Sequence, residues 1–250
     1  MNDRLPASVI WMRPSRGSRG PEPSRDREAI TRVAIGIADR EGLAAVSMRR
    51  LAAEIGTGTS SLYRYFTRKD DLLNLMVDGA LRPGLVGTTG DWAEDLRQMA
   101  HSTRALFKAH PWLATALAGR PTLGPNRLRA LEGVLDLLSS TGLSLGERLV
   151  LVDTLTSYVR GFVASELADI AAIREAGLSA EQWHADQAAY TDAIARSGTY
   201  PLVTGLFAEF RAMGVSGDES QNRSFAAGLE IILAGMDARL GRSRTGTGTT

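Results

Sequence analysis

Cysteine is absent from this sequence of 250 residues, and histidine occurs only three times. Disulfide frameworks, thiolate zinc sites and cysteine nucleophiles are therefore excluded, and a multi-histidine metal site has little to draw on. No apolar run approaches the roughly 18 residues that a membrane span needs, and the apolar stretch at residues 9–12 is too short for a signal-peptide core. We therefore expect a cytoplasmic protein with no metal and no membrane partner.

Common enzyme motifs are missing as well. The sequence has no Walker phosphate loop and no His-Glu-x-x-His metal motif. His101 and His110 are nine residues apart, but Pro111 interrupts the helical face that they would share. We interpret Glu166 and Asp169, three residues apart on an expected helix, as a solvated face rather than a catalytic pair. We expect no enzymatic activity and no cofactor.

The net charge of +1 conceals an asymmetry along the chain. Residues 1–71 hold 13 Lys and Arg against 9 Asp and Glu, whereas residues 72–250 hold 16 against 19. A basic first part is typical of a module that faces an anion, although solvated surface charge alone produces a difference of this size.

Breaker-rich segments at both ends enclose a long helical region. Residues 1–24 contain four Pro and two Gly, and residues 241–250 are rich in Gly, Thr and Ser, so we predict a flexible arm and a flexible tail. Between them, apolar residues recur at intervals of three and four, without strand alternation. The pattern predicts an all-α fold with helices over residues 30–41, 47–55, 59 or 60 to 66, 70–77, 92–109, 125–141, 145–175, 179–194, 201–213 and 222–240, and with a short helical piece after Pro111.

The most informative stretch runs from Ser47 to Phe66 and has the spacing of a helix-turn-helix. Gly56 supplies the turn, and Ala52 is small enough for the two helices to cross closely. We expect Leu51, Ile55 and Leu62 to form the core that the two helices share. The motif therefore predicts a DNA-binding unit in which the second helix enters the major groove.

The outer face of the second motif helix carries hydroxyl, aromatic and basic side chains. Tyr63 and Tyr65 cannot both share the side of Leu62 and Phe66, so at least one of them is expected to be exposed. Hydroxyls, a basic side chain and helical N–H groups suit phosphates and base edges. The alternative is a helical hairpin whose aromatics belong to the core. The candidate DNA contacts on this helix are Thr59, Ser60, Ser61, Tyr63, Arg64 and Tyr65.

Three segments together resemble a known family. They are Ala-Ala-Glu-Ile-Gly, then Ser-Leu-Tyr-Arg-Tyr-Phe, then Lys-Asp-Asp-Leu-Leu ending at residue 73. Residues 25–76 are similar to the DNA-binding domain of the tetracycline-repressor (TetR) family of bacterial regulators. The resemblance implies a homodimer that binds a palindromic operator and releases it when a small molecule enters a second domain. It places Ser47, Met48 and Arg49 at the start of the first motif helix and Lys69 on phosphate.

The rest of the chain resembles the tetracycline-repressor type of C-terminal domain. The resemblance implies a ligand-binding and dimerisation domain over residues 77–240, in which the helix at 145–175 and the last helix pack against their copies. The family's metal-coordinating His is Ala116 here, and two drug contacts appear as Gln98 and Ser102. We therefore do not expect a magnesium-tetracycline ligand.

The second domain holds many aromatic side chains but few His or clustered acids, which favours an apolar or aromatic effector bound without metal. Most large apolar residues in a helical bundle are simply core, so each candidate has that alternative. Gln98, His101 and Arg104 are the expected polar anchors, although a solvated face explains them equally well. The expected apolar contacts are Phe107, Trp112, Tyr158, Phe162 and Trp183.

The last helix carries two apolar stripes, more than one packed face needs. Phe225, Leu229, Ile232, Leu233 and Met236 form one stripe, and a second stripe of small residues and Ile231 allows close approach. We therefore expect a homodimer. Taken together, the sequence predicts a ligand-responsive transcriptional repressor. The competing hypothesis is a helical ligand carrier or enzyme that does not bind DNA.

Overall fold

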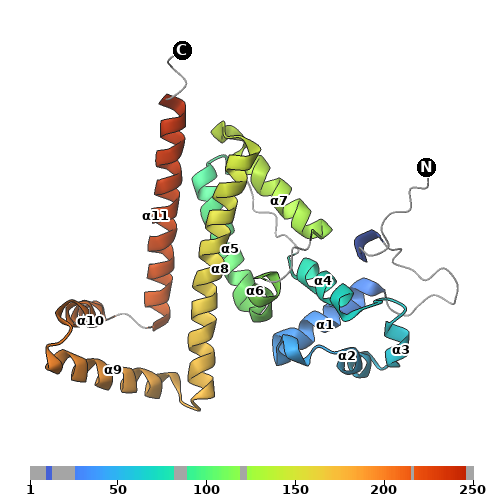
Figure 1. Ribbon diagram of the computed structural model, residues 1–250, viewed down its shortest axis with the longest axis horizontal. Coiled ribbons are helices and arrows are strands. Elements are labelled where there is room, and N and C mark those ends of the chain that lie inside the picture. Colours follow the sequence, from blue (N-terminus) through green and yellow to red (C-terminus); the bar gives the residue numbers. More distant parts are fainter. Residues whose placement is uncertain (1–9, 13–25, 82–88, 119–122, 215–216, 246–250) are drawn as a thin grey trace. The chain divides into compact units, whose positions relative to one another are not determined.

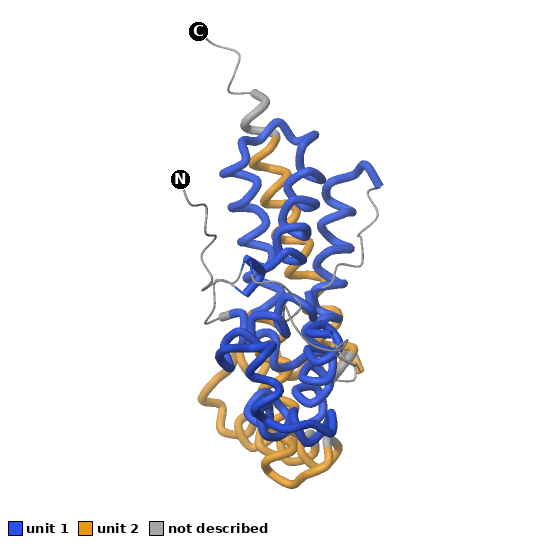
Figure 2. The backbone as a smooth tube through the Cα atoms, turned by 90° about the vertical axis from the view of Figure 1, so that its right-hand side faces the viewer, with its two compact units in different colours: residues 1–160 blue, residues 161–250 orange. Residues whose placement is uncertain are grey.

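The computed structural model describes residues 10–12, 26–81, 89–118, 123–214 and 217–245. Within these ranges every regular element is helical, which confirms the all-α prediction. The chain divides into two compact units, residues 1–160 and 161–250, which Figure 2 distinguishes by colour. The divide lies inside one long helix, and each unit is described separately.

The first unit begins with a short 3₁₀ turn, η1 (Ile10–Met12), followed by α1 (Arg27–Glu41), η2 (Leu43–Ala45), α2 (Met48–Ile55), α3 (Thr59–Leu62) and α4 (Lys69–Ala80) (Figure 1). It continues with α5 (Trp92–Ala109), α6 (Pro111–Ala118), α7 (Pro125–Leu137), η3 (Leu138–Thr141) and the first half of α8 (Leu145–Glu175). The second unit holds the rest of α8, α9 (Ala180–Ser197), α10 (Pro201–Met213) and α11 (Gly217–Thr245).

The short N-terminal helices follow local capping rules. The Asp26 carboxylate accepts a hydrogen bond from the Ala29 N–H at 2.6 Å, which caps α1. Gly42 ends α1 with φ 83°, and Gly56 ends α2 in the left-handed region with φ 66°, where other residues are strained. The sequence therefore predicts the ends of α1 and α2 correctly.

Several helix ends differ from the prediction by a few residues, and the differences at α3 and α11 have local causes. The recognition segment was expected to be helical to Phe66, but α3 ends at Leu62, because the chain tightens there and the Tyr65 N–H bonds the Leu62 carbonyl three residues back at 2.9 Å. In contrast, α11 runs to Thr245, past the predicted end at residue 240, because a Gly such as Gly241 weakens a helix without necessarily ending it.

The predicted arm includes one ordered turn. Ile10 in η1 is buried, and η1 packs against α4. The remaining residues of the arm, 1–9 and 13–24, lie outside the described residues. The predicted domain boundaries stay predictions.

One prediction about the second unit is wrong. Glu166 on α8 is only 2% exposed rather than part of a solvated face, whereas Asp169 is exposed as expected. Residues three apart on a helix are separated by about 300° of rotation, about 60° short of a full turn, so one of the two can be buried while the other is exposed.

Candidate DNA-binding surface and its links to the effector region

The helix-turn-helix has the core that its sequence predicts. Leu51, Ile55 and Leu62 are all buried, together with Phe66. The Ser47 hydroxyl oxygen accepts a hydrogen bond from the Arg50 N–H at 3.1 Å and so caps α2. These contacts fix α2 against α3 and leave the outer face of α3 to solvent.

Most of the predicted DNA contacts lie on exposed or half-buried positions. Tyr63 is 54% exposed, so the expectation that at least one of the two tyrosines faces solvent is confirmed. Tyr65 is half-buried, and its ring lies 6.3 Å from that of Phe66. Ser47, Thr59 and Ser61 are half-buried as well. The exposed members of the set are Arg49, Ser60, Tyr63, Arg64 and Lys69.

Met48 departs from this pattern. Its side chain is only 8% exposed and belongs to the core of the first unit. As the first residue of α2, it presents only a backbone N–H at the positive end of a helix, where anions are favoured. A side-chain role of Met48 on DNA is not compatible with this burial.

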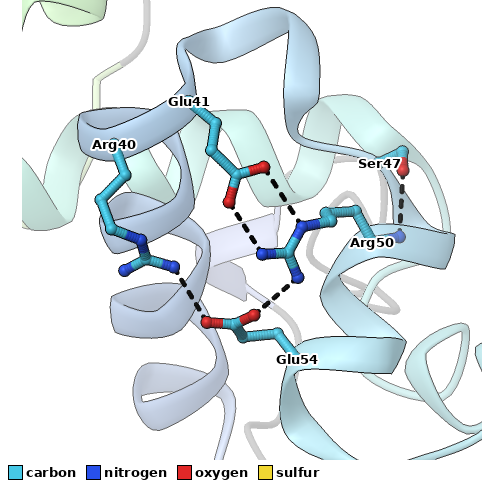
Figure 3. A network of polar contacts seen from close by, with 5 residues as sticks. All are labelled: Arg40, Glu41, Ser47, Arg50 and Glu54. Carbon is cyan, nitrogen blue, oxygen red and sulfur yellow. Dashed lines mark hydrogen bonds and ion pairs between the residues drawn. The ribbon is translucent and has the colours of Figure 1, made fainter.

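An ion-pair network braces α2 against the end of α1 (Figure 3). The Arg50 guanidinium donates two hydrogen bonds to the Glu41 carboxylate, at 2.7 and 3.2 Å, and one to Glu54 at 2.6 Å. Arg40 reaches the other oxygen of Glu54 at 2.9 Å. The hydrogen bonds from Arg50 lower the pKa of both carboxyl groups, and those carboxylates raise the pKa of Arg50.

The start of α4 is fixed by a buried carboxylate. One oxygen of Asp71 accepts hydrogen bonds from the N–H groups of Thr67 and Arg68, at 3.1 and 3.2 Å. Arg68 is the N-cap residue of α4 and Thr67 precedes it, so Asp71, in the first turn of α4, bonds the segment that leads into the helix. Lys69, the first residue of α4, therefore follows a turn that side-chain hydrogen bonds hold in place.

A second carboxylate joins α1 to the corner between α5 and α6. Asp39 Oδ1 accepts a hydrogen bond from the Trp112 indole Nε1–H at 2.7 Å and lies 2.8 Å from His110 Nδ1. The rings of His110 and Trp112 meet edge to face, with centroids 6.1 Å apart. This joint connects the helix-turn-helix region to the helices that follow it.

A third carboxylate joins α4 to the start of α7. Asp78 is buried, and its carboxylate accepts hydrogen bonds from the N–H groups of Asn126 and Arg127, at 3.1 and 3.0 Å to Oδ1. In return, the Asn126 side-chain amide donates to the Asp78 carbonyl oxygen at 2.9 Å. Both α1 and α4 are therefore bonded to later helices through carboxylates: α4 through the buried Asp78, and α1 through Asp39, whose side chain is 28% exposed.

The predicted effector anchors on α5 do not share one environment. Gln98 is half-buried and donates a hydrogen bond to Glu94 at 3.0 Å, His101 is exposed, and Arg104 is buried. The hydrogen bond from Gln98, followed by that from Arg97, lowers the pKa of Glu94.

The apolar effector candidates are divided between the two units. In the first unit, Phe107 and Trp112 are buried and Tyr158 is half-buried. Burial raises the pKa of Tyr158, and the positive charge of Arg104 opposes this rise. In the second unit, Phe162 and Trp183 are half-buried, and the Phe162 ring packs edge to face on Phe225 with centroids 5.2 Å apart.

The sequence interpretation missed Asp39, Asp78 and Gly124. Asp39 and Asp78 look like ordinary helical acids, because their partners lie 71 to 73 and 48 to 49 positions away. One local signal was available: Gly124 precedes the helix that starts at Pro125 but has no side chain to cap it. A helix that lacks its own N-cap side chain indicates that an acceptor from elsewhere in the chain bonds its first N–H groups.

Two searches of the described part of the chain bear on other functions. No group of three or more His, Asp or Glu side chains within it is arranged to hold a metal ion. None of its helices combines the length and the apolar character needed to cross a membrane.

Comparisons with known proteins give a consistent picture. Residues 30–76 match the family model described as bacterial regulatory proteins, tetR family, and residues 86–240 match the one described as tetracyclin repressor-like, C-terminal domain. The transcriptional repressor DrrR1 of Streptomyces coeruleorubidus is 38% identical over 240 residues, which cover 94% of this chain and 86% of the relative. A transcriptional regulator of Saccharopolyspora erythraea is 30% identical over 242 residues, 93% of each chain.

Solved structures of ActR from Streptomyces coelicolor are similar along nearly the whole chain. Apo ActR has a TM-score of 0.68 at 29% identity and is covered fully by 89% of this chain. ActR in complex with actinorhodin has a TM-score of 0.65 at 31% identity, with the same coverage.

Proposed function

Because the chain belongs to the tetracycline-repressor (TetR) family of bacterial transcriptional regulators, we propose that it binds a palindromic operator as a homodimer and leaves it when a small apolar or aromatic molecule binds. The family places it among regulators and not among enzymes. We assign DNA binding to residues 25–76, and effector binding and dimerisation to residues 77–240.

The observation that carries the DNA-binding assignment is the exposed face beside a buried helix-turn-helix core. Tyr63, Arg64 and Lys69 are exposed within seven residues, whereas Leu62 just before them and Phe66 among them are fully buried. We assign Arg49 and Arg64 to base edges, and Ser47, Tyr65 and Lys69 to phosphates. Thr59, Ser60 and Ser61 at the start of α3 complete the surface.

The test is binding to a duplex selected by the protein from a randomised pool, followed by fluorescence anisotropy. Arg64→Ala is expected to cost about 1 to 3 kcal/mol on the selected duplex and little on unrelated DNA. Lys69→Ala is expected to weaken binding to all sequences and to lower the salt slope by about one unit. Undiminished binding by a variant that lacks the Tyr63, Arg64 and Tyr65 side chains would refute the recognition-helix assignment.

The effector assignment is supported by the ActR structures, one of which contains actinorhodin and another (S)-DNPA. Within the first unit we assign the site to Phe107, Trp112 and Tyr158, with Gln98, His101 and Arg104 as polar contacts. Phe162 and Trp183 of the second unit stay predicted effector contacts. A 100-fold release of operator requires the ligand to favour the DNA-incompetent state by about 2.7 kcal/mol. Titration of the operator complex with actinorhodin, with and without a chelator, tests both the release and its independence of metal.

The homodimer is supported by the two faces of α11. Phe225, Leu229, Leu233 and Met236 are buried in the second unit, and Ile232 is half-buried. The other stripe is exposed in the single chain: Ile231 is 73% exposed, flanked by exposed small residues. Close approach of a second α11 would cover it.

Light scattering at micromolar concentration tests the homodimer. The wild-type protein is expected to have twice the mass of one chain, and Ile231→Glu to shift the population towards the single chain. Asp237→Lys, an exposed change on the same helix, serves as the control for added charge. A wild-type protein of single-chain mass contradicts the proposal.

A further inference from the structure

The first turn of α7 is capped by a side chain from another helix. Gly124 occupies the N-cap position and contributes no side-chain hydrogen bond. Asp78, on α4, takes its place and accepts hydrogen bonds from the N–H groups of Asn126 and Arg127, the donors that an N-cap side chain normally satisfies. The Asn126 side chain donates back to the Asp78 carbonyl oxygen, so the exchange is reciprocal.

The two elements also fit each other sterically. A Cβ atom added at Gly124 would overlap the Asp78 carboxylate. Gly124 has an ordinary extended backbone, with φ −75° and ψ 163°, so its conformation does not require glycine. Glycine is required at this position because Asp78, which is only 4% exposed, approaches it closely. The contact between α4 and α7 is therefore a closely fitted joint.

Continuous helical structure extends from this joint in both directions. Towards the effector region, α7 runs directly into η3, and η3 packs against α5, which carries Arg104 and Phe107. Towards the DNA-binding surface, α4 runs back to Lys69, its first residue. Helices transmit displacement along their length with little distortion, so Asp78 lies where the two paths meet.

We infer that Asp78 is a positioning residue that couples α7 to α4, so that a displacement of α7 and η3 reorients the DNA-binding helices. The inference rests on the proposed function, because it assigns the route by which effector binding changes operator affinity. Coupling between sites is reciprocal, so operator binding must also change α7 and η3. That reverse effect is measurable without knowledge of the natural effector.

The experiment is amide hydrogen exchange of the full-length protein, free and saturated with the selected duplex. In the wild-type protein, operator binding is expected to slow exchange at residues 130–141 by about fivefold or more, the lower end of typical couplings. These residues lie beyond Asn126 and Arg127, so the signal is not simply the loss of the two hydrogen bonds to Asp78. In Asp78→Ala the operator-dependent change is expected to disappear.

Two matched variants separate coupling from stability. Asp78→Asn keeps a carbonyl acceptor at the same place and is expected to retain the operator-dependent change. Asp95→Ala removes a different buried carboxylate, which accepts a hydrogen bond from the Thr89 N–H at 2.7 Å and lies on neither α4 nor α7, and it is also expected to retain the operator-dependent change.

A third variant gives α7 an N-cap side chain of its own but removes the contact between α7 and α4. Asp78→Gly combined with Gly124→Ser removes the steric overlap and gives α7 a hydroxyl of its own at the N-cap. In the absence of DNA, the amides of α7 in this variant are expected to exchange as slowly as in the wild-type protein. Operator binding is not expected to slow their exchange further.

The possible outcomes distinguish failure of the proposed function from failure of this inference. A wild-type protein that binds no duplex refutes the proposed function and this inference with it. A wild-type protein that binds the duplex with unchanged exchange at residues 130–141 refutes the inference alone. Retention of the full response in Asp78→Ala, or in the self-capped variant, likewise overturns the role of Asp78 and leaves DNA binding intact.

Discussion

Removal of the Asp39 carboxylate is expected to destabilise the joint between α1 and the α5–α6 corner. Asp39→Ala deletes the acceptor for the Trp112 indole N–H at 2.7 Å and the contact to His110 at 2.8 Å. Trp112 is only 5% exposed, so its N–H loses its partner where water has little access. The substitution removes two hydrogen bonds worth about 1 kcal/mol each, and one of them leaves a buried donor without an acceptor. We therefore expect the free energy of unfolding to fall by about 2 to 3 kcal/mol.

Thermal unfolding followed by circular dichroism measures this loss. At about 2 to 4 °C per kcal/mol for a chain of this size, Asp39→Ala is expected to lower Tm by about 4 to 12 °C. Asp39→Asn keeps an acceptor oxygen and is expected to lower Tm by much less. Trp112→Phe removes the indole donor, so its effect and that of Asp39→Ala should not add in the double variant. A Tm of Asp39→Ala within about 1 °C of wild type, or strict additivity, refutes the reasoning.

Three further predictions concern other parts of the molecule. Arg50 lowers the pKa of Glu41 and Glu54 in the folded protein. The stability that Arg50 contributes is therefore present above their ordinary pKa of 4.5 and is lost as the pH falls through the lower folded values. The Tm difference between wild type and Arg50→Gln should accordingly shrink between roughly pH 5 and pH 3. Burial raises the pKa of Tyr158 above its ordinary value of 10.0, so absorbance titration should show a late tyrosine ionisation that Tyr158→Phe removes. Phe225→Ala, which empties a fully buried position, should cost about 3 to 5 kcal/mol in chemical denaturation, and a loss under about 1 kcal/mol would contradict its place in the core.

Local signals in the sequence predicted the fold where the physics is local. Ser47 and Gly56 bound α2 through capping and a left-handed turn, and both act within a few residues. The same holds for the exposure of Tyr63, which follows from helical geometry. Met48 was placed on DNA from family resemblance, and its burial shows that position in a motif does not determine which way a side chain points.

The joints could not be predicted because they depend on contacts between distant positions. Nothing near Asp39 or Asp78 distinguishes these residues from solvated helical acids, and their partners are on helices far along the chain. Glu166 was misassigned for the same reason, since only packing against other elements decides whether an acid on a long helix is buried.

The borrowed cap of α7 also has a consequence for the order of folding. A helix with its own capping residue can close its first turn locally, but α7 depends on Asp78, 48 positions earlier. Closure of that long loop costs chain entropy before the first turn of α7 gains its hydrogen bonds. The start of α7 should therefore become ordered only after α4 has docked, late among the events that build the first unit. Once α7 is in place, α4 can separate from it only by giving up that turn.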